Sequence, residues 1–344
     1  MDILRIIAIY LVVFNHTGLN GFFLFSVSQN SPFYSVYLFI SIATKIAVPL
    51  FWMISGALLL KKEEPISHVL LKRVPRFFVV LLVFSAFQYI VSLNFDFSKI
   101  SLAYFFTQLY SSPFATTYWY LYAYLGYLLM LPLLRKLASG MKNIDFLYLI
   151  SLRFLIALLP IAQFLIWKGE VKYAANFELQ LVADVIFYPI IGHYAEHLIP
   201  EKYLSKKNNI ILAVISLAAI IICCFMTHFY CTVTDNWSIS NGQPFHNVLT
   251  FIPTISIYLS AKQFFKNKRI SNSAEKAITA ISGTTFGIML TENIIRYNTN
   301  QIYTALEPHI GPLPASMLWV GAVCCIGGLI IFIIKLIPFM KKLI

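Results

Sequence analysis

The chain has 344 residues, of which 59% are hydrophobic and only 12% are charged, and its formal net charge is +12. No water-soluble domain needs that much apolar surface, so the composition excludes an ordinary soluble enzyme and favours a helical membrane protein. The basic residues are spread over separate loops, which argues against a nucleic-acid-binding surface.

Ten apolar runs are long enough to cross a bilayer. They lie at about 3–25, 35–60, 77–94, 117–134, 146–166, 177–198, 209–230, 247–265, 279–297 and 313–337. The connections between them are too short to hold a soluble domain. We therefore predict an all-α, polytopic membrane bundle of about ten transmembrane helices that forms one domain over residues 1–344.

The lysines and arginines predict the orientation of this bundle. If the amino terminus is cytoplasmic, about 20 of the 26 basic residues fall on the cytoplasmic side and about four fall outside. This bias follows the positive-inside rule and places both termini in the cytoplasm. The four outer residues are Lys99, Lys168, Lys172 and Arg296.

The first run carries two polar residues, Arg5 and His16. On an α-helix, eleven residues bring the two side chains to within roughly 20° of one face and separate them by about 16.5 Å along the axis. One face thus presents a cation at the cytoplasmic end and a titratable group deeper in the membrane. Pairing of Arg5 with Asp2 explains the arginine alone, and a hydrogen bond between helices is the alternative explanation for the histidine.

Three more ionisable residues fall at a depth similar to that of His16, namely Lys45, Asp184 and Glu292. Ionisable groups inside a membrane are costly, so their agreement in depth favours a shared polar cavity. Pairwise neutralisation is the competing hypothesis, with one ion pair between Lys45 and Asp184 and another between Glu292 and Arg296.

A basic cluster opens the third run, where Lys72, Arg73 and Arg76 fall within about one helical turn. Such a cluster can bind phosphate oxygens, although basic residues at this position also serve topology and lipid contact. No spacing of histidines, cysteines and acidic residues indicates a metal site.

Several segments together resemble acyltransferase family 3, the integral-membrane enzymes that O-acylate bacterial glycans. The opening "DILRIIAIYLVVFNH" is similar to the family's Arg/His signature, "VPLFWMISGALLL" at 48–60 to its Ser-Gly segment, and "RVPR" at 73–76 to its Arg-x-x-Arg motif. "YWYLYAYLGYLLMLPLL" at 118–134 resembles its Trp-containing fourth span, and "FGIMLTENII" at 286–295 resembles a late segment. In that late segment Glu292 stands where the family often has histidine.

The resemblance implies an acyltransferase of the bacterial cytoplasmic membrane that takes an acyl group, usually acetyl, from cytoplasmic acyl-CoA. No permanently bound cofactor is implied, and the acceptor is a hydroxyl of a cell-surface glycan or lipid-linked sugar. His16 and Arg5 are implied as catalytic residues, with the donor phosphates on Arg73, Arg76 and Lys72. Candidate supporting or acceptor-side residues are Asn15, Lys45, Ser55, Trp119, Asp184 and Glu292.

Histidine suits this chemistry, because an imidazole takes up and returns a proton near neutral pH. His16 could act as general base or carry the acyl group itself. For Ser55 and Trp119, close helix packing and anchoring at the membrane interface are the alternative roles. A secondary transporter or glycan flippase is the alternative function, since it would also need several spans with buried charges.

Overall fold

The computed structural model describes residues 1–169, 182–237, 245–266, 268 and 270–344. Within these ranges the chain is helical and contains no strand, which confirms the all-α prediction. Its longer helices are α1 (Asp2–Asn15), α3 (Tyr34–Ala43), α4 (Ala47–Leu59), α6 (Val74–Ser92), α7 (Leu102–Ser111), α8 (Trp119–Gly140), α9 (Asn143–Trp167), α10 (Asp184–His193), α11 (Lys206–Thr234), α12 (Phe251–Lys266), α13 (Asn272–Ser282), α14 (Thr285–Asn298), α15 (Asn300–Ile310) and α16 (Pro312–Ile334). Short elements connect them, including α2 (Leu24–Val27), α5 (Ile66–His68), α17 (Pro338–Leu343) and the single turns η2 (Thr44–Ile46) and η3 (Val69–Arg73).

Six helical segments in the described ranges are long and apolar enough to cross a membrane. They are Tyr34–Leu59, Ile66–Ser92, Thr116–Gly140, Asn143–Trp167, Lys206–Thr234 and Pro312–Ile334. Each overlaps a predicted run, although Ile66–Ser92 begins well before the run predicted at 77–94. The other four runs contain the shorter helices α1, α10, α12 and α14, and the start of run 177–198 lies outside the described residues. The chain is a multi-pass membrane protein, and a count of about ten spans stays a prediction.

The composition predicted one continuous helix over 3–25, but the first apolar run does not form one. Helix α1 ends at Asn15, and His16 caps it. Gly18 then adopts a φ of +59°, a backbone conformation that favours glycine, and the Thr17 hydroxyl accepts a hydrogen bond from the Phe22 amide at 2.9 Å. The chain therefore turns directly after His16, which stands at the end of a short helix.

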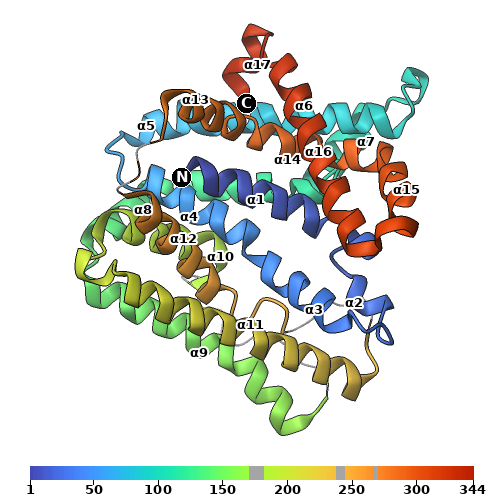
Figure 1. Ribbon diagram of the computed structural model, residues 1–344. Coiled ribbons are helices and arrows are strands. Elements are labelled where there is room, and N and C mark those ends of the chain that lie inside the picture. Colours follow the sequence, from blue (N-terminus) through green and yellow to red (C-terminus); the bar gives the residue numbers. More distant parts are fainter. Residues whose placement is uncertain (170–181, 238–244, 267, 269) are drawn as a thin grey trace.

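Helices α1 and α4 lie in the middle of the molecule (Figure 1). Helix α1 packs on α4, α14 and α16, and α4 packs closely on α10. This last contact depends on two glycines, because a Cβ on Gly56 would overlap the Pro189 carbonyl and a Cβ on Gly192 would overlap the Met53 carbonyl. The Ser-Gly segment thus serves close helix packing, as its alternative interpretation expected.

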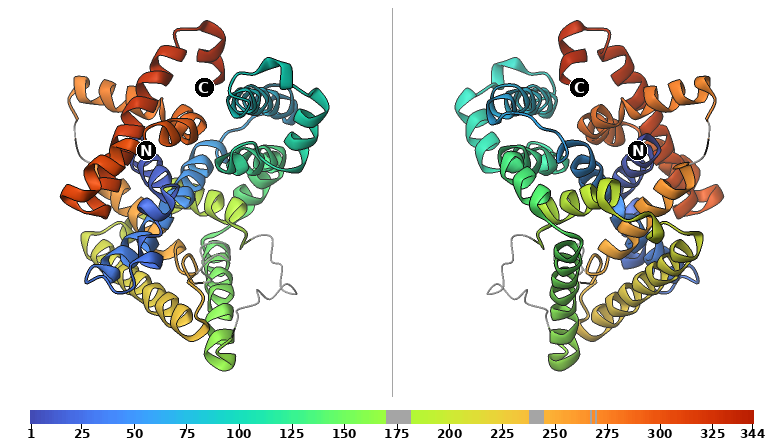
Figure 2. Two further views of the ribbon diagram at one scale, coloured as in Figure 1. Left: turned by 90° about the vertical axis from the view of Figure 1, so that its right-hand side faces the viewer. Right: turned by 90° about the vertical axis from the view of Figure 1, so that its left-hand side faces the viewer.

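Helices α9 and α11 are long helices at the periphery (Figure 2). Both carry large apolar side chains on their exposed surfaces, including Leu155, Ile166, Val214, Ile221 and Phe225. Apolar side chains on the outer face of a long helix are typical of contact with lipid.

One end of the bundle gathers segments that the charge bias predicted to share a membrane face. The Ser282 hydroxyl donates to Asp2 at 2.9 Å, and the Lys335 ammonium donates to the Gly283 carbonyl at 2.6 Å. The two termini lie on this side of the molecule (Figure 1). We call it the basic end, and its assignment to the cytoplasm stays a prediction.

Candidate functional site

The centre of the candidate site is a contact between His16 and Glu292. His16 follows the last residue of α1, while Glu292 lies in α14, which packs against α1. Nδ1 of His16 is 3.1 Å from Oε1 of Glu292. The Glu292 side chain is 0% exposed, whereas that of His16 is 26% exposed. The histidine is thus accessible from one side and backed by a buried carboxyl group.

Glu292 has a second partner on its own helix. Nε of Arg296 donates to Oε2 of Glu292 at 3.3 Å, and Nη2 of the same arginine donates to Asn293 at 3.1 Å. The predicted pair of Glu292 with Arg296 is therefore present. Glu292 contacts His16 as well as Arg296. One cluster therefore contains both the predicted ion pair and a polar site shared with His16.

This geometry leaves one imidazole nitrogen for a substrate. Nδ1 faces Glu292, so Nε2 is the nitrogen without a carboxylate partner. A carboxylate this close to Nδ1 stabilises the imidazolium that forms when Nε2 takes a proton. The arrangement can therefore support general-base or nucleophilic chemistry.

Asn15 and Lys45 lie near the carboxyl end of α1, next to His16. Nδ2 of Asn15 donates to the Thr44 carbonyl at 3.2 Å, which joins the end of α1 to the turn η2. Lys45 is the next residue in that turn, and its ammonium lies 4.8 Å from the centroid of the Phe22 ring.

Asp184 is not a partner of Lys45, and this hypothesis from depth was wrong. Nη2 of Arg153 donates to Oδ1 of Asp184 at 2.6 Å, so helix α9 supplies the counter-charge. Depth along a helix does not determine which helices are neighbours. Helix α9 places Arg153 against Asp184, whereas Lys45 of η2 makes no ion pair with it. Trp119 is 45% exposed at the start of α8, a position that fits anchoring at the membrane interface.

Arg5 lies at the other end of α1 from His16. Its Nη1 donates to Asp2 at 2.8 Å, which is the helix-end pair that the sequence predicted. The guanidinium groups of Arg73, Arg5 and Arg76 all act electrostatically on the Tyr124 side chain of α8. Three arginines from α1, η3 and α6 therefore lie within electrostatic range of one tyrosine.

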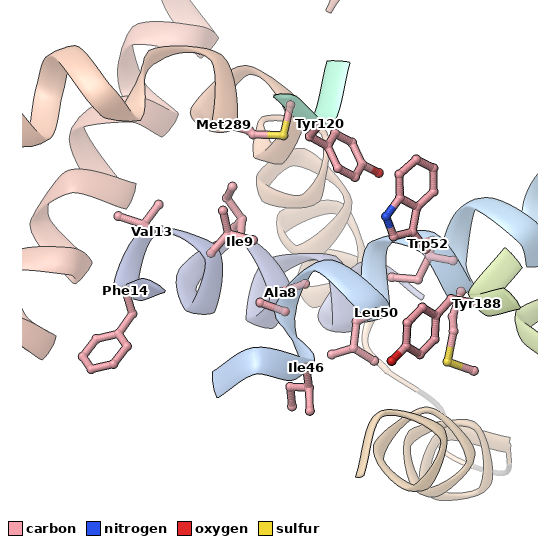
Figure 3. Packing of buried hydrophobic residues seen from close by; sticks show 14 of the residues in the cluster. Ala8, Ile9, Val13, Phe14, Ile46, Leu50, Trp52, Tyr120, Tyr188 and Met289 are labelled. Carbon is pink, nitrogen blue, oxygen red and sulfur yellow. The ribbon is translucent and has the colours of Figure 1, made fainter. Parts of the chain in front are cut away.

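An aromatic wall, formed by Trp52, Tyr120 and Tyr124, adjoins these arginines. Trp52 of α4 stacks with Tyr124 at 5.7 Å between ring centroids and lies 4.8 Å from Tyr120, and Figure 3 shows Trp52 and Tyr120 next to each other. Ser55 is within hydrogen-bonding reach of the side chains of both tyrosines. Ser55 thus has a polar role beside the helix contact of its neighbour Gly56.

Arg73 is held by an acidic residue. Nε and Nη2 of Arg73 donate to the two oxygens of Glu64 at 3.0 and 2.5 Å, and Arg135 donates to Oε2 of Glu64 at 3.0 Å. These hydrogen bonds, from Arg73 first, lower the pKa of Glu64 from its usual value to about 2. Glu64 therefore stays ionised at neutral pH and fixes Arg73 to Arg135 of α8.

The other two residues of the basic cluster differ from Arg73. Nε and Nη2 of Arg76 both donate to the Leu343 carbonyl at 3.2 Å, while Lys72 is exposed on η3. Arg76 is thus engaged by a neutral carbonyl, which competes less strongly with a phosphate than a carboxylate does. Among the residues that the structure describes, no group of three His, Cys, Asp or Glu side chains could hold a metal ion.

Sequence reasoning missed Glu64 and the aromatic wall. Glu64 belongs to the stretch "KKEEP", where its acidic character looked like ordinary loop composition. Trp52, Tyr120 and Tyr124 recur at helical spacing in apolar runs, which is also the pattern of core residues. Tyr118 was missed as well, and its hydroxyl donates at 2.8 Å to the Leu290 carbonyl near Glu292.

The fold and the site define a multi-pass membrane protein that carries a carboxylate-backed histidine at one end of a short helix and an arginine cluster at the other. A family model described as "Acyltransferase domain" matches residues 1–336. The chain therefore belongs to acyltransferase family 3, as the sequence motifs predicted. No curated protein and no solved structure gave a match to this chain.

Proposed function

We propose that this protein is a membrane O-acyltransferase of the bacterial cytoplasmic membrane. It moves an acyl group, most often acetyl, from cytoplasmic acyl-CoA to a hydroxyl of a cell-surface glycan or lipid-linked sugar. The contact of His16 with the buried Glu292 at 3.1 Å carries this proposal, because it provides a base whose protonated form a carboxylate stabilises. The family membership supports acyl transfer, and no observation favours a transporter.

In the direct route, Nε2 of His16 takes the proton of the acceptor hydroxyl while the oxygen attacks the thioester carbonyl. The C–S bond then breaks, and the leaving thiolate takes the proton from the imidazolium. Glu292 stabilises the positive charge of the ring. In the two-step route, Nε2 attacks the thioester carbonyl, the C–S bond breaks, and the thiolate leaves. The acceptor oxygen then attacks the acyl-imidazole, the C–N bond breaks, and the hydroxyl proton passes to the released imidazole.

The donor phosphates bind at the basic end, on Arg73 and Arg76 with Lys72 at the rim. Guanidinium groups bind phosphate oxygens through paired hydrogen bonds, and Arg5 lies within electrostatic range of the same tyrosine, Tyr124, as Arg73 and Arg76 do. The thioester arm then follows α1 past Ser55 towards His16. Asn15 and Lys45 lie on the acceptor side, whereas Trp119 and Asp184 serve anchoring and ion pairing.

Acyl transfer in membrane vesicles tests this function. Vesicles that contain the protein receive acetyl-CoA with a labelled acetyl group, and label is measured in extracted glycans and in the protein. His16→Ala should abolish transfer to glycans, and His309→Ala, an exposed histidine in α15, should not change it. Equal glycan labelling by the wild type and His16→Ala would reject the catalytic assignment.

Mass spectrometry of surface glycans from cells with and without the protein identifies the group that is transferred. The expected mass difference is that of one acetyl group per modified sugar. Label that accumulates on His16 when no acceptor is present would favour the two-step route, whereas its absence would favour direct transfer.

A further inference from the structure

A lysine without a counter-ion lies beside the candidate site. Lys45 is half-buried in the turn η2, and its ammonium contacts the Phe22 ring at 4.8 Å. Among the described residues, no carboxylate lies within ion-pair distance of it. A lysine inside a membrane protein normally pairs with an anion, because removing its charge from water is costly.

A buried histidine faces the same place. His246, just before α12, is only 3% exposed, and its Nε2 lies 2.7 Å from the Ser41 hydroxyl. Nδ1 of His246 is buried and has no hydrogen-bond partner in the described part of the chain. Both side chains contact the Phe22 ring, since the Lys45 ammonium lies 4.8 Å and the His246 ring centroid 5.7 Å from its centroid.

The Ser41 contact is compatible with two tautomers of His246, and one of them presents a donor to an anion. When Nε2 accepts the hydrogen bond from the Ser41 hydroxyl, the ring proton resides on Nδ1. An N–H donor then stands without an acceptor. Buried donors are nearly always satisfied, so this one calls for a partner from outside the described chain.

Aromatic rings surround the two donors. The rings of Phe22, Phe23 and Phe25 lie 5.7, 6.4 and 5.3 Å from the His246 ring, measured between centroids. Apolar surroundings strengthen an interaction between opposite charges, because they lower the local dielectric constant. A site of this kind attracts an anion more strongly than an exposed lysine does.

Two contacts join this cluster to the candidate catalytic histidine. Asn15 bonds to the carbonyl of Thr44, the residue before Lys45, and Phe22 bonds to Thr17, the residue after His16. Both the lysine and the aromatic ring beneath it are thus fixed to the end of α1. Arg296 and Arg153 differ from Lys45, since Arg296 pairs with Glu292 and Arg153 pairs with Asp184.

We propose that Lys45 and His246 bind one oxyanion of the acceptor, a carboxylate or a phosphate, so that its hydroxyl meets His16. The acceptor is then an acidic sugar or a sugar linked to a lipid through phosphate. This inference rests on the proposed function for the role of the acceptor, while anion binding itself is measurable without transfer.

Binding of matched probes to the protein in nanodiscs of neutral phosphatidylcholine, without acyl-CoA, tests the site. One pair is a glucuronate-containing oligosaccharide and its carboxyl-reduced counterpart. The other pair is a neutral oligosaccharide linked to polyprenyl diphosphate and the same oligosaccharide free. We expect the wild type to bind at least one anionic probe about tenfold or more tightly than its neutral match, and the preferred pair identifies the source of the anion.

Three substitutions assign this preference to the site. Lys45→Met and Lys45→Gln should abolish it, and both should fold, since each removes a charge from apolar surroundings. Lys45→Arg should retain it. Lys99→Met is the control, because Lys99 is 68% exposed, pairs with Asp96 and should behave as the wild type.

Equal binding of the anionic and neutral probes by the wild type would overturn the inference, as would a preference that persists in Lys45→Met and Lys45→Gln. The proposed function fails differently, through absent transfer of the labelled acyl group in vesicles. If the protein binds the anion but transfers no acyl group, the proposed function is rejected and the anion-binding site is still supported.

Discussion

The Glu292 carboxylate lies 3.1 Å from the His16 imidazole, although α14 and α1 belong to opposite ends of the chain. A buried carboxylate in contact with one histidine nitrogen directs the other nitrogen outward. His16 and Glu292 should therefore act together in catalysis.

Replacement of Glu292 by glutamine tests this relationship. The amide keeps the shape of the side chain but cannot stabilise an imidazolium, so we expect acyl transfer to fall by about 10²- to 10⁴-fold. The measurement is kcat for labelled acetyl transfer in vesicles. Glu307→Gln in α15, a half-buried glutamate away from this pair, is the matched control. A wild-type rate in Glu292→Gln would reduce Glu292 to a structural partner of Arg296.

The arginines at the basic end should determine donor affinity. We expect the double variant Arg73→Ala, Arg76→Ala to weaken binding of acyl-CoA by about tenfold or more, because each loses charge-assisted hydrogen bonds to phosphate. Equilibrium binding of a non-hydrolysable acyl-CoA analogue measures this. Lys136→Ala removes an exposed charge from the same end and serves as control. Unchanged affinity in the double variant would exclude these arginines from the donor site.

Glu64 should make stability depend on pH. Its pKa in the folded protein is about 2, below its usual value near 4.5, so its contribution to stability is present above pH 4.5 and is lost as the pH falls towards 2. We expect Glu64→Gln to cost on the order of 1 kcal/mol at pH 7, a small value because water screens surface charges. Thermal unfolding in detergent at several pH values checks this. The difference between wild type and Glu64→Gln should shrink below pH 4.5, and a difference independent of pH would contradict the assignment.

The close contact of α4 with α10 should tolerate no side chain at Gly56. Alanine there would overlap the Pro189 carbonyl, so we expect Gly56→Ala to destabilise the protein by about 1–3 kcal/mol. Gly126→Ala in α8 is the control, because a Cβ at that position meets no neighbouring atom. Thermal unfolding of both variants decides the matter, and equal stability would mean that the helices separate at little cost.

The sequence was sufficient to predict the all-α membrane fold, the family and a helix that has Arg5 near its start and leads to His16. Helical periodicity and hydropathy are local properties, and α1 extends as its spacing required. The end of α1 was not predictable from hydropathy, since apolar residues from Leu19 to Phe25 continue after Gly18. A single backbone conformation at Gly18 outweighed that pattern.

Partners distant in the chain were harder to predict. Depth in the membrane brought His16 and Glu292 into one layer but also suggested a pair of Lys45 with Asp184, which Arg153 replaces. Glu64 shows the same limit, because its partners Arg73 and Arg135 come from two other helices. Which charges meet depends on how helices pack, and a hydropathy profile contains no such information.

The early end of α1 has a consequence for how far an acyl group travels. Fourteen helical residues span about 21 Å, against about 30 Å for the hydrocarbon core of a bilayer. On the proposed path, the thioester arm covers only this shorter distance, and the acceptor enters the remaining depth from the opposite side. The turn at Gly18 thereby shortens the proposed path of the acyl donor to less than the thickness of the hydrocarbon core.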